Sequence, residues 1–209
     1  MRYSFARLFC WALLAFTSVS VAGAAKKPLV TIGSVVKLLH DKTKYRLHSH
    51  EIAYGSGSGQ QSVTSVPNGE DSNSYWVVSA PLNQWQPHGT PVKSGDKIRL
   101  QHSTTKAWLH SHAHTSPLSG NQEVSCYGNP EVSDAGDVWI VELDESGSSW
   151  QQDRKVRFKH ASTAKYLITH DKKFGRPIHG QQEVCAVKRK DDMAVFTATE
   201  GVFLPKIEL

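Results

Sequence analysis

Histidine is the residue type whose number and spacing first suggest chemistry, with 11 in 209 residues. His48 and His50 stand two residues apart, as do His110, His112 and His114. On a strand this spacing places each set on one face, and two or three imidazoles can bind zinc. The pattern recurs within a repeat, however, and no Cys or carboxylate is placed to join it. We therefore predict structural histidines and no metal ligand, catalytic residue or cofactor.

A glycine–serine run, Gly55 to Gly59, is the next candidate. It lacks the Gly-Lys-Ser/Thr ending of a phosphate-binding loop, so the pattern indicates a hairpin connection. Exposed connections often carry binding residues. We predict a partner contact in this segment, which comprises Tyr54, Gly55, Ser56, Gly57, Ser58 and Gly59.

Other residue types argue against an enzyme. No Gly-x-Ser-x-Gly nucleophile elbow occurs, and Asp71, Asp134 and Asp191 are typical of turns. Trp76 and Trp139 are predicted to lie in the core. The less regularly placed tryptophans are candidates for a glycan or peptide surface, namely Trp85, Trp108 and Trp150.

The strongest signal is a threefold repeat with a period of about 60 residues. Copies 1, 2 and 3 are marked by a first histidine, His40, His102 or His160. In each copy a Thr follows three residues later, a Leu seven later and a second His ten later. Further downstream, each copy has a Gly-x-Gln-x-Val segment and ends on an aromatic residue, Trp76, Trp139 or Phe196.

Each copy contains four short segments with strand character and no helical period. Val36, Leu38 and His40 alternate with outward residues, which is typical of a half-buried strand. A four-stranded unit of this size cannot bury its own apolar face. Three such units closed around a pseudo-threefold axis form an all-β β-trefoil, in which Leu47, Leu109 and Leu167 meet near the axis.

The N-terminal segment has the features of a secretory signal peptide. Arg2 and Arg7 precede the apolar run 8–16, and small residues follow, so we predict cleavage after Gly23 or Ala24. The apolar run is too short for a membrane span. Lys and Arg exceed Asp and Glu by 24 − 19 = 5, and removal of the two arginines leaves +3. This weak charge does not favour nucleic-acid binding.

Two cysteines remain after cleavage, Cys126 and Cys185, an even number suited to an oxidising compartment. They lie one residue out of register in equivalent strands, and adjacent strand residues point to opposite faces. A disulfide bond and two free thiols both remain open.

Several motifs resemble those of a known family. Leu47-His48-Ser49-His50 and Leu109-His110-Ser111-His112 resemble the MIR motif, shared by protein O-mannosyltransferases and by inositol-trisphosphate and ryanodine receptors. With the segments 54–64, 71–76 and 116–125, the chain looks like the stromal cell-derived factor 2 family. The resemblance implies three MIR repeats after the signal peptide (1–24), at residues 29–86, 92–148 and 150–204, and a C-terminal tail, 205–209.

That resemblance also implies a function. The family acts without enzymatic activity in folding quality control in the endoplasmic-reticulum lumen and in the unfolded-protein response, with a J-domain co-chaperone and luminal Hsp70. The tail Lys206-Ile207-Glu208-Leu209 departs from an HDEL-type retrieval signal at its isoleucine, which leaves secretion as an alternative. The alternative function is a lectin-like module that binds O-mannosyl or other glycans on secretory clients.

Overall fold

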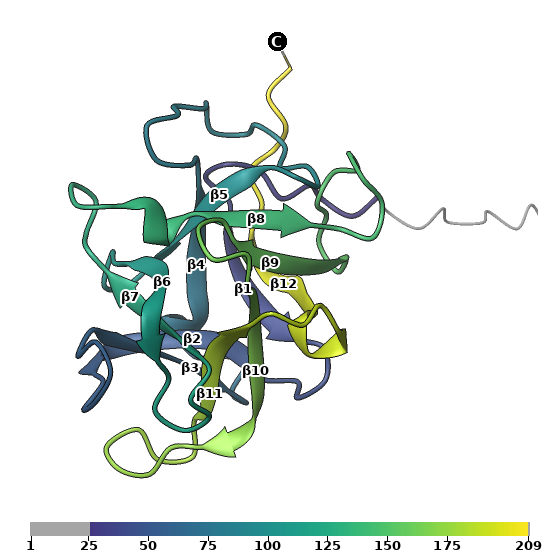
Figure 1. Ribbon diagram of the computed structural model, residues 1–209. Coiled ribbons are helices and arrows are strands. Elements are labelled where there is room, and N and C mark those ends of the chain that lie inside the picture. The colour runs from purple at the N-terminus through teal and green to yellow at the C-terminus, as the bar shows by residue number, and fades with distance from the viewer. Residues whose placement is uncertain (1–25, 209) are drawn as a thin grey trace, which may run out of the picture.

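The computed structural model describes residues 26–208, so the proposed signal peptide lies outside the described residues. The chain forms twelve strands in three groups of four (Figure 1). In the described part of the chain no helix is long and apolar enough to cross a membrane. The strands are β1 (Val35–His40), β2 (Arg46–Ala53), β3 (Gln61–Val66), β4 (Tyr75–Ser79), β5 (Lys97–His102), β6 (Trp108–Thr115), β7 (Gln122–Tyr127), β8 (Trp139–Glu142), β9 (Lys155–His160), β10 (Tyr166–Lys173), β11 (Gln182–Val187) and β12 (Phe196–Val202).

Six strands close into a barrel. The first strand of each copy pairs with the last strand of its own copy and of the copy before it, always antiparallel. The ring runs β1–β4–β5–β8–β9–β12 and returns to β1. Closure leaves no barrel edge available for pairing with another chain.

The other six strands form a cap of three hairpins, β2–β3, β6–β7 and β10–β11. Their second strands also pair with one another in a triangle, β3 with β7, β7 with β11 and β11 with β3. A six-stranded barrel covered by three hairpins is a β-trefoil, which confirms the fold predicted from the repeat.

One apolar cluster fills the barrel and the base of the cap. Leu47, Leu109 and Leu167 belong to it and are completely buried, and so are the three valines of the cap strands, Val63, Val124 and Val184. Trp76 and Trp139 are also fully buried, as predicted. Because inward residues alternate along each barrel strand, one buried face per copy supplies the whole core.

The first histidine of each copy joins that copy to its neighbour. Its Nδ1 lies 2.9 Å from the Oγ1 of the Thr three residues later, in His40, His102 and His160 alike. Its Nε2 donates to a backbone carbonyl in the 3-10 turn of the preceding copy, and copy 3 precedes copy 1 around the ring. The acceptors are Met193 in η3 (Asp192–Ala194), Asn73 in η1 (Ser72–Ser74) and Gly136 in η2 (Ala135–Asp137), at 2.8 to 3.0 Å.

The same three turns depend on the predicted turn aspartates. Asp71, Asp134 and Asp191 each cap a 3-10 turn by accepting the backbone N–H two residues later. The aromatic residue that follows each turn packs against the next copy's histidine, with ring centroids 5.0 to 5.1 Å apart. Each junction between copies therefore repeats one set of contacts: capped turn, aromatic ring and histidine.

These buried histidines make stability depend on pH. Burial lowers the pKa of His40, His102 and His160, and lowers that of His48 to about 4. The unfolded chain therefore binds more protons, so their contribution is complete above about pH 6.5 and is lost as the pH falls towards 4. We expect the melting temperature to fall over that range.

The expected loss of stability in acid should be smaller in His102→Gln, which cannot take up the proton at that junction. His179→Gln is the matched control, since His179 is exposed. A melting temperature that stays constant from pH 7 to 4.5 would contradict this interpretation.

Candidate interaction surface

Three connections between the cap hairpin strands meet at the end of the molecule opposite the first and last described residues, 26 and 208 (Figure 1). We call residues 54–60, 116–121 and 174–181 cap loops 1, 2 and 3. They occupy equivalent places: each begins with a backbone hydrogen bond from its first residue, such as Tyr54 to Gln60. Beneath them Tyr54, Phe174 and Ile178 form a small apolar cluster with Leu118 packed against it.

Tyr54 is an anchor of this end rather than an exposed contact. Its side chain is 6% exposed, and its hydroxyl donates to the Val63 carbonyl at 2.7 Å. Burial raises the pKa of Tyr54 well above its ordinary value. The prediction that Tyr54 offers a partner contact is therefore wrong, because its ring fills the base of the cap.

Of the other residues of cap loop 1 that were predicted to contact a partner, all but one are exposed. Gly55, Ser56, Gly57 and Gly59 are exposed, but Ser58 is held at its base. Its backbone N–H donates to Oε2 of Glu123 at 3.1 Å, and its hydroxyl bonds the same carboxylate. Gly57 passes so close that a Cβ there would lie 2.0 Å from that oxygen, so glycine is required. Cap loop 1 is thus a tethered loop with an exposed tip.

Two fully buried glutamates, Glu123 and Glu183, hold the cap loops. Glu183 accepts the backbone N–H of Leu118 at 2.6 Å and of Ser119 at 3.3 Å, and His170 Nε2 lies 2.9 Å from it. His112 stands beside Glu123 in the same way, at 3.1 Å. Each copy's glutamate thus holds the loop of the copy before it. Ser62 takes this place in copy 1, so cap loop 3 has no carboxylate tether.

The histidines therefore have carboxylate neighbours, which sequence reasoning did not find. His110 Nδ1 donates to the buried Asp137 at 2.9 Å, and His48 Nε2 lies 3.4 Å from Asp71. Hydrogen bonds from the His170 imidazole to Cys185 and Glu183 raise the pKa of His170 to about 9. The expectation that no Cys or carboxylate joins these histidines is wrong. Glutamates at the same place in copies 2 and 3 were the available signal.

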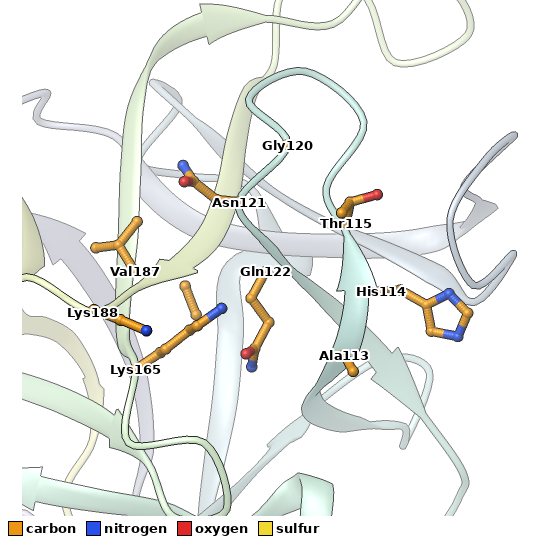
Figure 2. A pocket seen from close by; sticks show the side chains of 10 residues that line it. Ala113, His114, Thr115, Gly120, Asn121, Gln122, Lys165, Val187 and Lys188 are labelled. Atoms are coloured by element: carbon orange, nitrogen blue, oxygen red, sulfur yellow. The ribbon is translucent and has the colours of Figure 1, made fainter.

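A cavity of about 270 Å³ lies between copies 2 and 3 (Figure 2). Figure 2 shows Lys165 and Lys188 on one wall and His114 on the other, with Gln122 between them. The complete lining is Ala113, His114, Thr115, Gly120, Asn121, Gln122, Lys165, Ala186, Val187 and Lys188, without an acidic residue. Two ammonium groups in one groove favour an anionic occupant such as a carboxylate side chain.

Only one of the three tryptophans proposed for glycan binding is at the surface. Trp85 is 86% exposed, on the connection between β4 and β5, beside a cavity of about 420 Å³ that Arg99 and His88 also line. Trp150 is completely buried and packs edge-on against Phe158. Trp108 is 5% exposed and lies under the Arg99 guanidinium. The predictions for Trp108 and Trp150 are wrong because both rings complete the interior.

Cys126 and Cys185 are both free and buried, so the open question is answered in favour of two thiols. Their side chains enter different apolar clusters: Cys126 belongs to the barrel cluster, and Cys185 packs with Tyr166, Ile168 and Ala194. The shift of one residue between equivalent strands accounts for this separation. Burial raises the pKa of Cys126 to about 12.

Comparison with known proteins places this geometry in a family. Residues 46–199 match the MIR domain family model. A stromal cell-derived factor 2-like protein of Arabidopsis thaliana is 52% identical over 191 residues, which cover 91% of this chain and 88% of that protein. The crystal structure of the SDF2-like protein from Arabidopsis thaliana superimposes with a TM-score of 0.84 at 53% identity, covering 86% of this chain and 99% of that chain.

A second solved structure is the S. cerevisiae protein O-mannosyltransferase Pmt1-Pmt2 complex bound to the sugar donor. It matches with a TM-score of 0.76 at 32% identity. The match covers 88% of this chain but 28% of that chain, so the likeness concerns one part of the larger protein.

The carboxylate tether makes a testable prediction. We expect Glu123→Gln to lower the free energy of unfolding by about 1 to 3 kcal/mol, since it weakens charge-assisted hydrogen bonds to a buried group. Hydrogen exchange should quicken at Ser58, whose amide bonds the carboxylate. Glu131→Gln is the control, because Glu131 is exposed. Unchanged exchange at Ser58 would show that the loop does not depend on Glu123.

Proposed function

Because this chain belongs to the stromal cell-derived factor 2 family of MIR-domain proteins, we propose that it is a non-catalytic adaptor in the endoplasmic-reticulum lumen. In this role it supports folding quality control and the unfolded-protein response by binding a J-domain co-chaperone and, with it, luminal Hsp70. The observation that carries the proposal is the 52% identity to a stromal cell-derived factor 2-like protein over 91% of the chain.

Two sequence features support the luminal location. The segment 1–24 has the pattern of a signal peptide, and the last four residues resemble an HDEL-type retrieval signal except at Ile207. Binding to a resident partner would retain the protein without that signal, and secretion is the alternative.

The cap end offers the surface for such a partner. The exposed tip of cap loop 1 lies there, held at Ser58 by Glu123, and Gly120 and Asn121 of cap loop 2 line one side of the lysine-lined cavity. An adaptor needs a surface that is ordered before binding, because less conformational entropy is then lost. The lysines favour an acidic segment of the partner.

The matching experiment is a pull-down from a luminal extract with the tagged mature chain. We expect recovery of a J-domain protein together with Hsp70, and loss of both when Lys165 and Lys188 are changed to Glu. The control is the double variant Lys93→Glu, Lys97→Glu, which reverses two exposed charges outside the cavity. Recovery of neither protein by the wild type would contradict the adaptor role. Loss with the control pair alone would contradict the assigned surface.

A second function, glycan binding, is favoured by one specific observation. Trp85 exposes an aromatic face beside a cavity lined by Gln84, His88 and Arg99, and aromatic faces stack on sugar rings. The structure of the related mannosyltransferase, whose complex binds a sugar donor, makes O-mannosyl glycans the first ligands to test.

We expect a glycan array to show saturable binding that Trp85→Ala abolishes if this second function is correct. Trp85→Ala should leave the melting temperature unchanged, because the side chain is exposed. Lys97→Ala serves as the surface control. The absence of saturable binding to any mannosylated ligand would reject the lectin-like role.

A further inference from the structure

Three different metal-ligating side chains converge on the hairpin β10–β11. An imidazole nitrogen of His170, a carboxylate oxygen of Glu183 and the Sγ of Cys185 all lie within 4.8 Å of one another. We propose that these residues bind a thiophilic divalent metal ion, with zinc as the first candidate. The site would be additional to the adaptor surface and does not depend on the proposed function.

Strand register explains why the three groups meet. Ile168 on β10 lies opposite Cys185 on β11. His170 and Glu183 stand two residues along from this pair on their respective strands, and residues two apart share one face of a strand. The register shifts between Thr169 and Lys173, where His170 lies, yet the three ligand atoms still gather on one side of the hairpin.

Cap loop 2 covers the cluster and points hydrogen-bond donors at it. Asn121 Nδ2 lies 3.4 Å from the Cys185 sulfur, and Ser119 Oγ lies 3.7 Å from it. The Leu118 amide bonds Oε1 of Glu183, while Oε2 lies 2.9 Å from His170 Nε2, so an ion between those two atoms would replace their hydrogen bond.

Comparison of the three copies sets this cluster apart. The equivalent positions hold His50, Ser62 and Thr64 in copy 1, and His112, Glu123 and Ser125 in copy 2. In copy 2 a histidine and a glutamate already tether a cap loop. Ser125 and Thr64, the equivalents of Cys185, each bond a cap-loop glutamine side chain, Gln60 and Gln181 respectively. Cys185 likewise contacts cap loop 2, but its sulfur alone completes a set of nitrogen, oxygen and sulfur ligands.

The donor set suits zinc. Zn²⁺ binds imidazole, carboxylate and thiolate at about 2.0 to 2.3 Å, and three protein ligands leave a fourth position for solvent. His170 Nε2 and Glu183 Oε2 lie 2.9 Å apart, which is closer than two ligands of one zinc ion, so this pair would open slightly to admit the ion. Loading places the imidazole proton on Nδ1, which gives up a 3.2 Å contact from the Lys172 amide.

Access to the site is limited but present. The His170 side chain is 15% exposed, while Glu183 and Cys185 are completely buried. Asn121, which contacts the sulfur, also lines the cavity between copies 2 and 3, where its side chain is drawn beside Val187 (Figure 2). Rotation of that side chain opens a path from the cavity to the cluster.

The test is a titration of the reduced mature protein with Co²⁺, followed by displacement with Zn²⁺. A cysteine ligand gives a thiolate-to-cobalt charge-transfer band in the near ultraviolet. We expect this band at one ion per chain. Cys185→Ser should abolish it, and His170→Gln should weaken binding by at least about tenfold. His170→Gln changes a partly exposed side chain, so it tests the site even if Cys185→Ser fails to fold.

The chain offers a matched control in its other buried thiol. Cys126 bonds Ser49 and has no place in the cluster, so Cys126→Ser should keep the band. A band that Cys126→Ser removes would overturn the proposal. Cobalt binding that gives no such band, and that is lost in His112→Gln or His114→Gln, would also overturn the proposal. The ions would then occupy the row of histidines on β6. Absence of saturable binding would overturn it too.

Discussion

The hydrogen bonds of three histidines to turns in neighbouring copies are the contacts on which the rest of this structure depends. No copy can bury its own apolar face, so the fold exists only when three copies close into a ring. His40, His102 and His160 make that closure specific, since each bonds its own Thr and a carbonyl of another copy. An apolar residue in these places would leave three buried turn carbonyls without partners, at a cost comparable to a lost hydrogen bond for each.

Much of this ring could be predicted from the sequence, because the information is local and repeated. The alternation of Val36, Leu38 and His40 indicates one buried strand face, and its recurrence twice more gives the trefoil. What the sequence does not contain is the partner of each polar side chain across copies. Glu123 and Ser58 are 65 positions apart, and no local pattern joins them. For the same reason Trp108 and Trp150, which lie outside the repeat pattern, gave no sign of burial.

Comparison of the three copies separates positions that every copy needs for the fold from positions that give a single copy its own properties. Where all three copies agree, as in the turn aspartates and the axial leucines, the residue serves closure or the core. Where they differ, the copies acquire separate properties. Phe196 replaces a tryptophan and so lacks the indole N–H that Trp76 and Trp139 donate to the Leu47 and Leu109 carbonyls. Tyr54, in a place that Ser116 fills in copy 2, reaches down to the Val63 carbonyl.

The cap end concentrates these departures, which is why function is to be sought there rather than at the barrel. Cap loops 1 and 2 are held by buried glutamates of the following copy, whereas Ser62 leaves cap loop 3 without one. Cap loop 3 is held instead by hydrogen bonds of Thr64 and His50 to the Gln181 side chain, and Phe174 and Ile178 pack with Tyr54. A carboxylate with several donors fixes a loop in one geometry, while apolar packing permits small shifts. One end of the molecule thus combines two loops tied by buried glutamates with a third loop held by uncharged groups and apolar packing.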